Sequence, residues 1–292
     1  MLFRRVCACL LTLGAFGALC GCGGNESPGE TEPVTGFTTV STPPVTQAAT
    51  EPVVTEPASP SLLSFLQTAV EPVGKTMYIW GGGWNEEDTG AGVEAVSLGV
   101  SPLWAEFAME QDETYNYKNH RYQIHDGLDC SGFVGWAVYN ALETESGGEG
   151  YVGKAAAMAQ DFADRGLGEY IPTSRLERWC PGDIMSMKGH VWISLGMCDD
   201  GSVLLVHASP PGVILCGTEL PGGGRSEAVE LARSLMEAHY PDWYSRYPDC
   251  SRSYSYLEKS SAMRWSREVL SDEEGLCEMT AYEVASLLWA EE

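Results

Sequence analysis

Cys130 is the residue of this sequence best placed to do chemistry. It lies in the stretch LDCSGFVGWAVYNAL, between Asp129 and Ser131 and ahead of a long apolar run. Asp is a good N-cap residue, so the run is expected to form a helix that begins at the cysteine. A helix N-terminus offers unpaired N–H groups and a positive dipole, which stabilise a thiolate. The stretch alone fits a nucleophile and a buried structural cysteine equally well.

A nucleophilic cysteine needs a base, and His190 and His207 lie in neighbouring predicted strands. The segments GHVWISLG and SVLLVHAS are joined by MCDDG, which indicates an antiparallel hairpin. A loop centred on Cys198–Asp199 pairs positions 190 and 207, and a loop centred on Asp199–Asp200 pairs 190 with 209. Both registers place the two imidazoles on one face, whereas an intermediate register places them on opposite faces.

We therefore expect His190 to form a thiolate–imidazolium pair with Cys130 and to protonate the leaving amine. His207 is expected to hold the second ring nitrogen of His190 and so fix its tautomer. The alternative is that both are strand histidines with no common task. The other three histidines lie in loop or helix segments and receive no role: His120, His125 and His239.

The surrounding pattern predicts helices first and strands later, which is typical of an α+β domain. Early helices are expected at 61–72, after Asp129, and at 154–166, with a short strand and glycine turn at 75–85. Short apolar runs joined by Gly and Asp turns then predict an antiparallel sheet. The runs predict strands within 181–187, 189–196, 202–209 and 210–218. After them we expect a helix at 226–239, a strand within 261–270 and a helix at 280–290.

Composition restricts the partners of the chain. Its 292 residues carry 17 basic and 41 acidic side chains, a formal net charge of -24. Such a charge argues against nucleic acid or an anionic membrane surface as an electrostatic partner, and we predict neither. The hydrophobic fraction of 44% is ordinary for a globular protein.

The N-terminus is predicted to be a targeting segment. Residues 1–21 combine a basic start with a short apolar run, and the stretch LCGC at 19–22 resembles the cleavage site of bacterial lipoproteins. We predict lipidation of Cys22 and an extracytoplasmic, membrane-anchored protein, with an ordinary cleaved signal as the alternative. Residues 22–60 are rich in Pro, Thr and Glu and are expected to be a disordered tether, so the folded domain is predicted at 61–292.

Four motifs, taken together, resemble the NlpC-type family of papain-like cell-wall cysteine peptidases. They are YIWGG at 78–82, LDCSGFV at 128–134, PGDIMSMKGHVWISLG at 181–196 and VLLVHAS at 203–209. The resemblance covers roughly residues 61–217 and implies a papain-like fold, with the cysteine helix packed on a central antiparallel sheet. It implies a cysteine endopeptidase that hydrolyses an amide bond in peptidoglycan stem peptides, most often the γ-D-glutamyl–diamino acid bond.

The resemblance also implies roles for individual residues. The nucleophile falls on Cys130, the base on His190 and the third polar residue on His207. The matching pocket residues of the family, implied to bind substrate, are Tyr78, Asp129 and Ser131. Alternatives on the same fold are an N-acetylmuramoyl-L-alanine amidase, an acyltransferase, or a wall-peptide-binding lipoprotein without catalysis.

Two segments depart from the family pattern. Residues 84–128 form an insertion before the cysteine, expected to be either a lid or specificity wall or a surface elaboration, and residues 218–292 extend beyond the usual core. No cofactor and no metal is predicted, because the remaining cysteines lack zinc-ligand spacing. Those in the folded part number five and cannot all pair internally: Cys180, Cys198, Cys216, Cys250 and Cys277.

Overall fold

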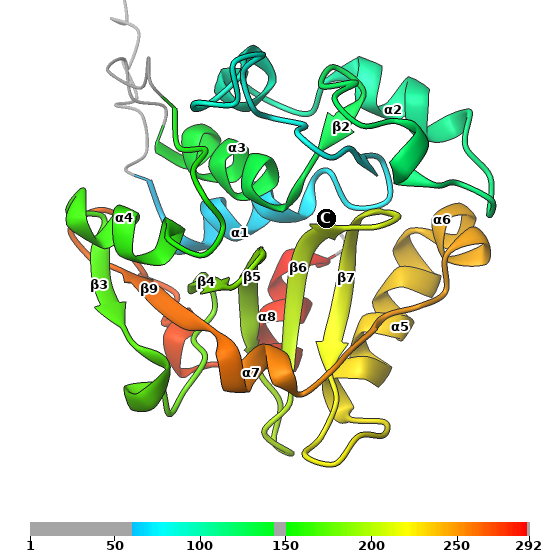
Figure 1. Cartoon of the computed structure of the whole chain (residues 1–292). Coiled ribbons are helices and arrows are strands. Elements are labelled where there is room, and N and C mark those ends of the chain that lie inside the picture. The colour runs from blue at the N-terminus through cyan, green and yellow to red at the C-terminus, as the bar shows by residue number, and fades with distance from the viewer. Residues whose placement is uncertain (1–59, 143–149, 291–292) are drawn as a thin grey trace, which may run out of the picture. The chain divides into compact units, whose positions relative to one another are not determined.

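The computed structural model describes residues 60–142 and 150–290 (Figure 1). The predicted signal peptide, Cys22 and the tether up to residue 59 lie outside the described residues. The described residues belong to one compact unit, Thr55–Glu292. Within them, no helix has the length and apolar character that crossing a membrane requires.

The described part of the chain contains a nine-stranded sheet with the order β2-β1-β7-β6-β5-β4-β9-β3, and β8 pairs with β7 off this path. Neighbouring strands run antiparallel except for the parallel pairs β1–β2 and β7–β8. The strands are β1 (Met77–Tyr78), β2 (Gly127–Leu128), β3 (Gly168–Ile171), β4 (Ile184–Met187), β5 (His190–Met197), β6 (Val203–Ser209), β7 (Gly212–Thr218), β8 (Ser251–Arg252) and β9 (Ser261–Trp265).

Eight α-helices of the described residues surround this sheet. They are α1 (Leu62–Val70), α2 (Pro102–Met109), α3 (Cys130–Leu142), α4 (Met158–Asp164), α5 (Glu227–His239), α6 (Pro241–Arg246), α7 (Ser255–Lys259) and α8 (Ala281–Leu288). Figure 1 shows α1 and α3 together above the strands and α8 behind β5 and β6. Together they bury the sheet, and the molecule is an α+β protein, as the sequence predicts.

Helix α3 occupies the centre because nearly all of its first nine residues are apolar and buried. It packs against β5, β6 and α1. Phe133 and Trp136 are completely buried. This burial fixes the helix and therefore the position of its first residue, Cys130.

The C-terminal extension is part of the same sheet. Strand β9 lies between β4 and β3, and β8 extends the pairing of β7. An ion pair between partly exposed Arg264 and buried Asp183 joins this extension to the turn before β4, and Arg264 donates from Nε and Nη2 to Asp183 at 2.9 and 2.7 Å. The insertion 84–128 contains α2 and short 3-10 helices, and it ends in β2, which pairs with β1.

A one-residue bulge in β5 sets the register of the β5–β6 hairpin. Near the turn Met197 pairs with Val203, whereas further along Ile193 pairs with Val206. The pairing shifts by one residue between Ser194 and Gly196. Beyond the bulge the register is the one that places position 190 opposite position 209, so the predicted common face of His190 and His207 is confirmed.

We expect Gly196→Ala to destabilise the protein by about 1–3 kcal/mol, because Gly196 has φ 110°, which side-chain-bearing residues rarely adopt. Urea unfolding followed by tryptophan fluorescence measures the change. Gly90→Ala is the control, since the nearest atom to an added Cβ lies 4.0 Å away. Equal stability of the two variants would show that the bulge does not need this conformation.

Candidate functional site

Asp129 joins the start of α3 to the glycine turn after β1. Its Oδ1 accepts hydrogen bonds from the Gly132 N–H and the Ser131 hydroxyl, both at 2.8 Å. Its Oδ2 accepts a hydrogen bond from the Gly81 N–H at 3.2 Å. Burial raises the pKa of this carboxyl to about 6, although the hydrogen bonds that it accepts lower the pKa by stabilising the charged form. The predicted N-cap is confirmed, and it fixes Cys130 relative to β1.

Tyr78 reaches the same place through the pairing of β1 with β2. It pairs with Leu128, two residues before Cys130. The Tyr78 ring is almost fully buried, and its pKa is raised, first by burial and then by the neighbouring Cys130 and Asp129. The phenol therefore lies beside the thiol as a neutral hydroxyl.

The two histidines of the hairpin contact each other directly. His190 Nε2 lies 2.8 Å from His207 Nδ1, and the rings are nearly perpendicular at 76°. The backbone N–H of Val191, the residue after His190, lies close enough to the Cys130 thiol to act against the rise of its pKa. The structure thus brings the helix start, the first residue of β5 and the end of β6 to one place.

The charges at this place differ from the predicted ion pair. Burial, and then the Asp129 carboxylate, raise the pKa of the Cys130 thiol to about 12. Burial, and then the positive charge of Arg252, lower the pKa of His190 to about 4. The pKa of His207 is also lowered, chiefly by burial. At neutral pH the resting site therefore holds a neutral thiol and neutral imidazoles.

A cleft of about 370 Å³ opens at the thiol. That volume is in the range of small-molecule and peptide-side-chain sites. The predicted pocket residues all line it, together with residues from α4's leading loop and the insertion: Tyr78, Asp129, Cys130, Ser131, Trp84 and Lys154. The polar atoms of Asp129 and Ser131 are largely engaged within the protein, so their direct binding of substrate stays a prediction.

The insertion 84–128 begins as a wall of this cleft. The Trp84 indole N–H donates a hydrogen bond to the Ser131 hydroxyl at 3.0 Å, and exposed Asp88 lines the same cleft. A second hollow of about 280 Å³ continues from it, between Trp84 and the Tyr122–His125 segment. This placement favours the specificity-wall interpretation of the insertion over a remote surface elaboration.

Two residues of the site are far from every sequence motif. Arg252 in β8 donates from Nε to His207 Nε2 at 3.3 Å. Tyr256 in α7 places its ring 5.5 Å from that of His190 and 6.0 Å from that of His207, centroid to centroid. Both lie in the C-terminal extension, and no spacing rule links them to the hairpin. The pairing of β8 with β7, the neighbour of β6, brings them there.

The other histidines have separate surroundings. His120 stacks on Tyr115, and His239 packs on Trp289 at the end of α5. His125 Nδ1 is paired with the buried carboxylate of Glu94 inside the insertion. None of them contacts the hairpin histidines in the described structure.

Comparison of this chain with protein-family models, with curated proteins and with solved structures finds no match. The interpretation of the cleft therefore rests on its geometry and on the sequence motifs.

Alkylation of Cys130 by iodoacetamide is expected to speed up about tenfold per pH unit from pH 6 to pH 9, because only the thiolate reacts and its pKa is about 12. The groups facing the sulfur include Asp129, Tyr78 and Tyr256. Mass spectrometry of the peptide that contains Cys130 separates it from the other cysteines. A rate that is already flat between pH 6 and pH 8 would instead reveal a resting thiolate–imidazolium pair.

Proposed function

We propose that this protein is a peptidoglycan hydrolase, a cysteine endopeptidase with a papain-like fold that cleaves an amide bond in cell-wall stem peptides. The observation that carries the proposal is the juxtaposition at the cleft. Cys130 begins a buried helix, that helix packs against β5, the strand that His190 begins, and His190 is hydrogen-bonded to His207. The four ordered motifs named above support the substrate class and the γ-D-glutamyl–diamino acid bond. Lipid anchoring at Cys22, outside the cytoplasm, belongs to the same proposal.

In the proposed reaction, His190 takes the proton of the Cys130 thiol while the sulfur attacks the carbonyl carbon of the amide. The C–N bond then breaks, His190 returns the proton to the leaving amine, and a thioester remains. Water hydrolyses the thioester with His190 again as the base, which restores the thiol. The proposed oxyanion donors are the Cys130 N–H at the helix start and the neutral Tyr78 hydroxyl, since Tyr78 and Cys130 line the same cleft.

A second candidate function is a wall-peptide-binding lipoprotein without catalysis. It is favoured by the raised pKa of Cys130 and the lowered pKa of His190, since both disfavour an activated thiolate. The same cleft would then bind a stem peptide without cleaving it. The two functions predict different outcomes in one experiment.

Cys130→Ala is expected to reduce the release of peptide fragments from purified muropeptides by at least about 10³-fold, because the nucleophile is removed. The full chain in detergent is incubated with muropeptides, and the products are identified by mass spectrometry, which also names the bond. Cys198→Ala is the matched control, since Cys198 is a buried thiol after β5, away from the cleft. Equal cleavage by the native protein and Cys130→Ala would refute the catalytic assignment. Muropeptide binding with no cleavage by either protein would establish the second candidate.

A further inference from the structure

Arg252 closes the side of His207 that faces away from His190. Its Nε–H donates to His207 Nε2 at 3.3 Å, and its side chain is only 12% exposed. Its Nη1 donates to the Ser251 carbonyl at 2.5 Å and to Asp249 Oδ2 at 3.3 Å. The guanidinium is thus held in place from several sides.

This contact determines where the proton of His207 is located. A guanidinium can only donate hydrogen bonds, so His207 Nε2 must accept with its lone pair. A neutral imidazole carries one proton, which is then on Nδ1 of His207. That Nδ1–H donates to His190 Nε2 at 2.8 Å. The proton of neutral His190 is consequently on Nδ1, the ring nitrogen that His207 does not engage and that the proposed reaction needs as the base.

A base toward Cys130 needs the opposite arrangement. His190 must offer a lone pair at Nδ1 and carry its proton on Nε2, which then donates to His207 Nδ1. His207 would have to carry its own proton on Nε2, directly against the Arg252 Nε–H. Two donors cannot share that contact, so the hydrogen bond from Arg252 must break before His190 can accept the thiol proton.

We propose that Arg252 is a positioning residue that holds the pair of His190 and His207 in the tautomer that cannot accept the thiol proton. The proposal rests on the proposed function and adds a restraint on its base. The charge of Arg252 acts in the same direction, because it disfavours the imidazolium that forms when His190 takes the proton. The C-terminal extension, which supplies Arg252, thereby restrains the reaction.

Arg252→Gln tests this restraint, because a Gln carbonyl oxygen can accept a hydrogen bond from His207 Nε2–H. We expect Arg252→Gln to raise both the rate of Cys130 alkylation at pH 7 and kcat/KM on muropeptides by about tenfold or more. Arg252→Lys keeps the charge and the donor and is expected to stay within a factor of three of the native protein. Arg225→Gln is the surface control, since Arg225 is 74% exposed.

Nitrogen-15 NMR of the full chain in detergent micelles reads the tautomers directly, independently of hydrolysis. The native protein should show His207 protonated at Nδ1, and Arg252→Gln should show it protonated at Nε2. A native His207 protonated at Nε2 would overturn the proposal, even if no Arg252 variant folds. Slower alkylation in a folded Arg252→Gln variant would overturn it as well. The tautomer change without hydrolysis by any variant would uphold the role of Arg252 and refute the proposed function.

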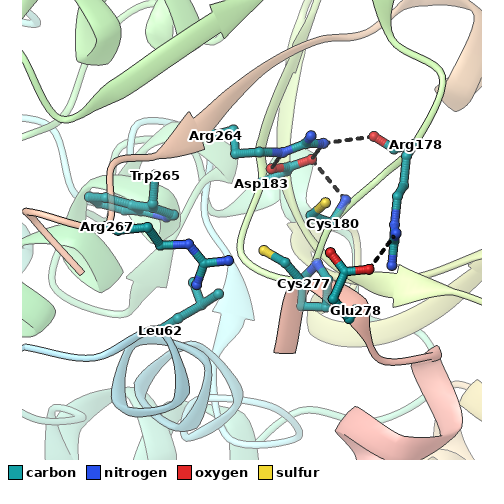
Figure 2. Close-up of a pocket in the computed structure, with 10 residues that line it drawn as sticks. Leu62, Arg178, Cys180, Asp183, Arg264, Trp265, Arg267, Cys277 and Glu278 are labelled. Atoms are coloured by element: carbon teal, nitrogen blue, oxygen red, sulfur yellow. Dashed lines mark hydrogen bonds and ion pairs between the residues drawn. The ribbon is translucent and has the colours of Figure 1, made fainter. Parts of the chain in front are cut away.

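A second, independent inference concerns Cys180 and Cys277. Both line a pocket of about 260 Å³ away from the cleft, and Figure 2 shows both sulfurs turned into it. The neighbouring Cys180 thiol, and then the charge of Arg267, lower the pKa of Cys277 to about 7, and burial acts in the opposite direction. Cys277 is partly exposed, whereas Cys180 is buried.

We propose that Cys180 and Cys277 form a disulfide by exchange with a low-molecular-weight disulfide. The Cys277 thiolate attacks one sulfur of the small disulfide and expels the first thiol. The Cys180 sulfur then attacks the mixed disulfide and expels the second thiol. The protein loses two electrons and two protons, and the small disulfide gains them. The link would tie 3-10 helix η5 (Leu276–Glu278) to the turn before β4.

The full chain in detergent, treated with oxidised glutathione, is expected to yield a linked peptide pair that contains Cys180 and Cys277. Its Tm is expected to be roughly 5–15 °C higher than that of the protein in dithiothreitol, because the bond closes a loop of roughly a hundred residues. Peptide mapping and thermal unfolding measure the two effects. Cys198→Ser should retain both effects and Cys277→Ser should lose both. Glutathione attached to Cys277 with no internal link would overturn the proposal.

Discussion

Leu195 is the residue of the β5 bulge that has no pairing partner in β6. The contact between His190 and His207 depends on this bulge. If the pairing of Met197 with Val203 continued without a shift, position 190 would lie opposite 210, and His207 would point to the other face of the sheet. The bulge corrects this by one residue, and Gly196 adopts the φ of 110° that accompanies it. The 2.8 Å contact between the imidazoles is therefore a consequence of backbone geometry several residues away.

The Asp129 carboxylate couples the other half of the site to the insertion. One oxygen caps α3 and the other accepts a hydrogen bond from the turn after β1. The Ser131 hydroxyl donates to Asp129 and accepts a hydrogen bond from the Trp84 indole, which links Asp129 to Trp84. Burying a charged carboxylate costs free energy. This cost raises the pKa of Asp129, even though its hydrogen bonds favour the charged form. Because the same group positions Cys130 and the first residue of the insertion, Cys130 and the cleft wall cannot move independently.

Local sequence signals predict most of the elements but only part of the site. The N-cap at Asp129, the helix after it and the strands 184–187, 190–197 and 203–209 follow from residue type and period, and the structure confirms them. The common face of His190 and His207 was predictable only as one of several registers, because turn geometry decides it. Arg252 was not predictable, since strand β8 has two residues and its pairing with β7 is set by tertiary packing.

The charged group nearest His207 has the opposite sign to the net charge of the protein. The chain has a formal net charge of -24, yet the group that faces the buried His207 is a guanidinium, and the thiol is neutral. A positive charge beside His207 weakens His190 as a base, so in the proposed reaction proton transfer from Cys130 accompanies attack on a carbonyl rather than preceding it. A neutral thiol also reacts slowly with oxidants and electrophiles, because these attack the thiolate. The burial that suppresses the thiolate therefore also protects Cys130 from oxidants and electrophiles, and under the proposed function this protection lasts until a substrate carbonyl occupies the cleft.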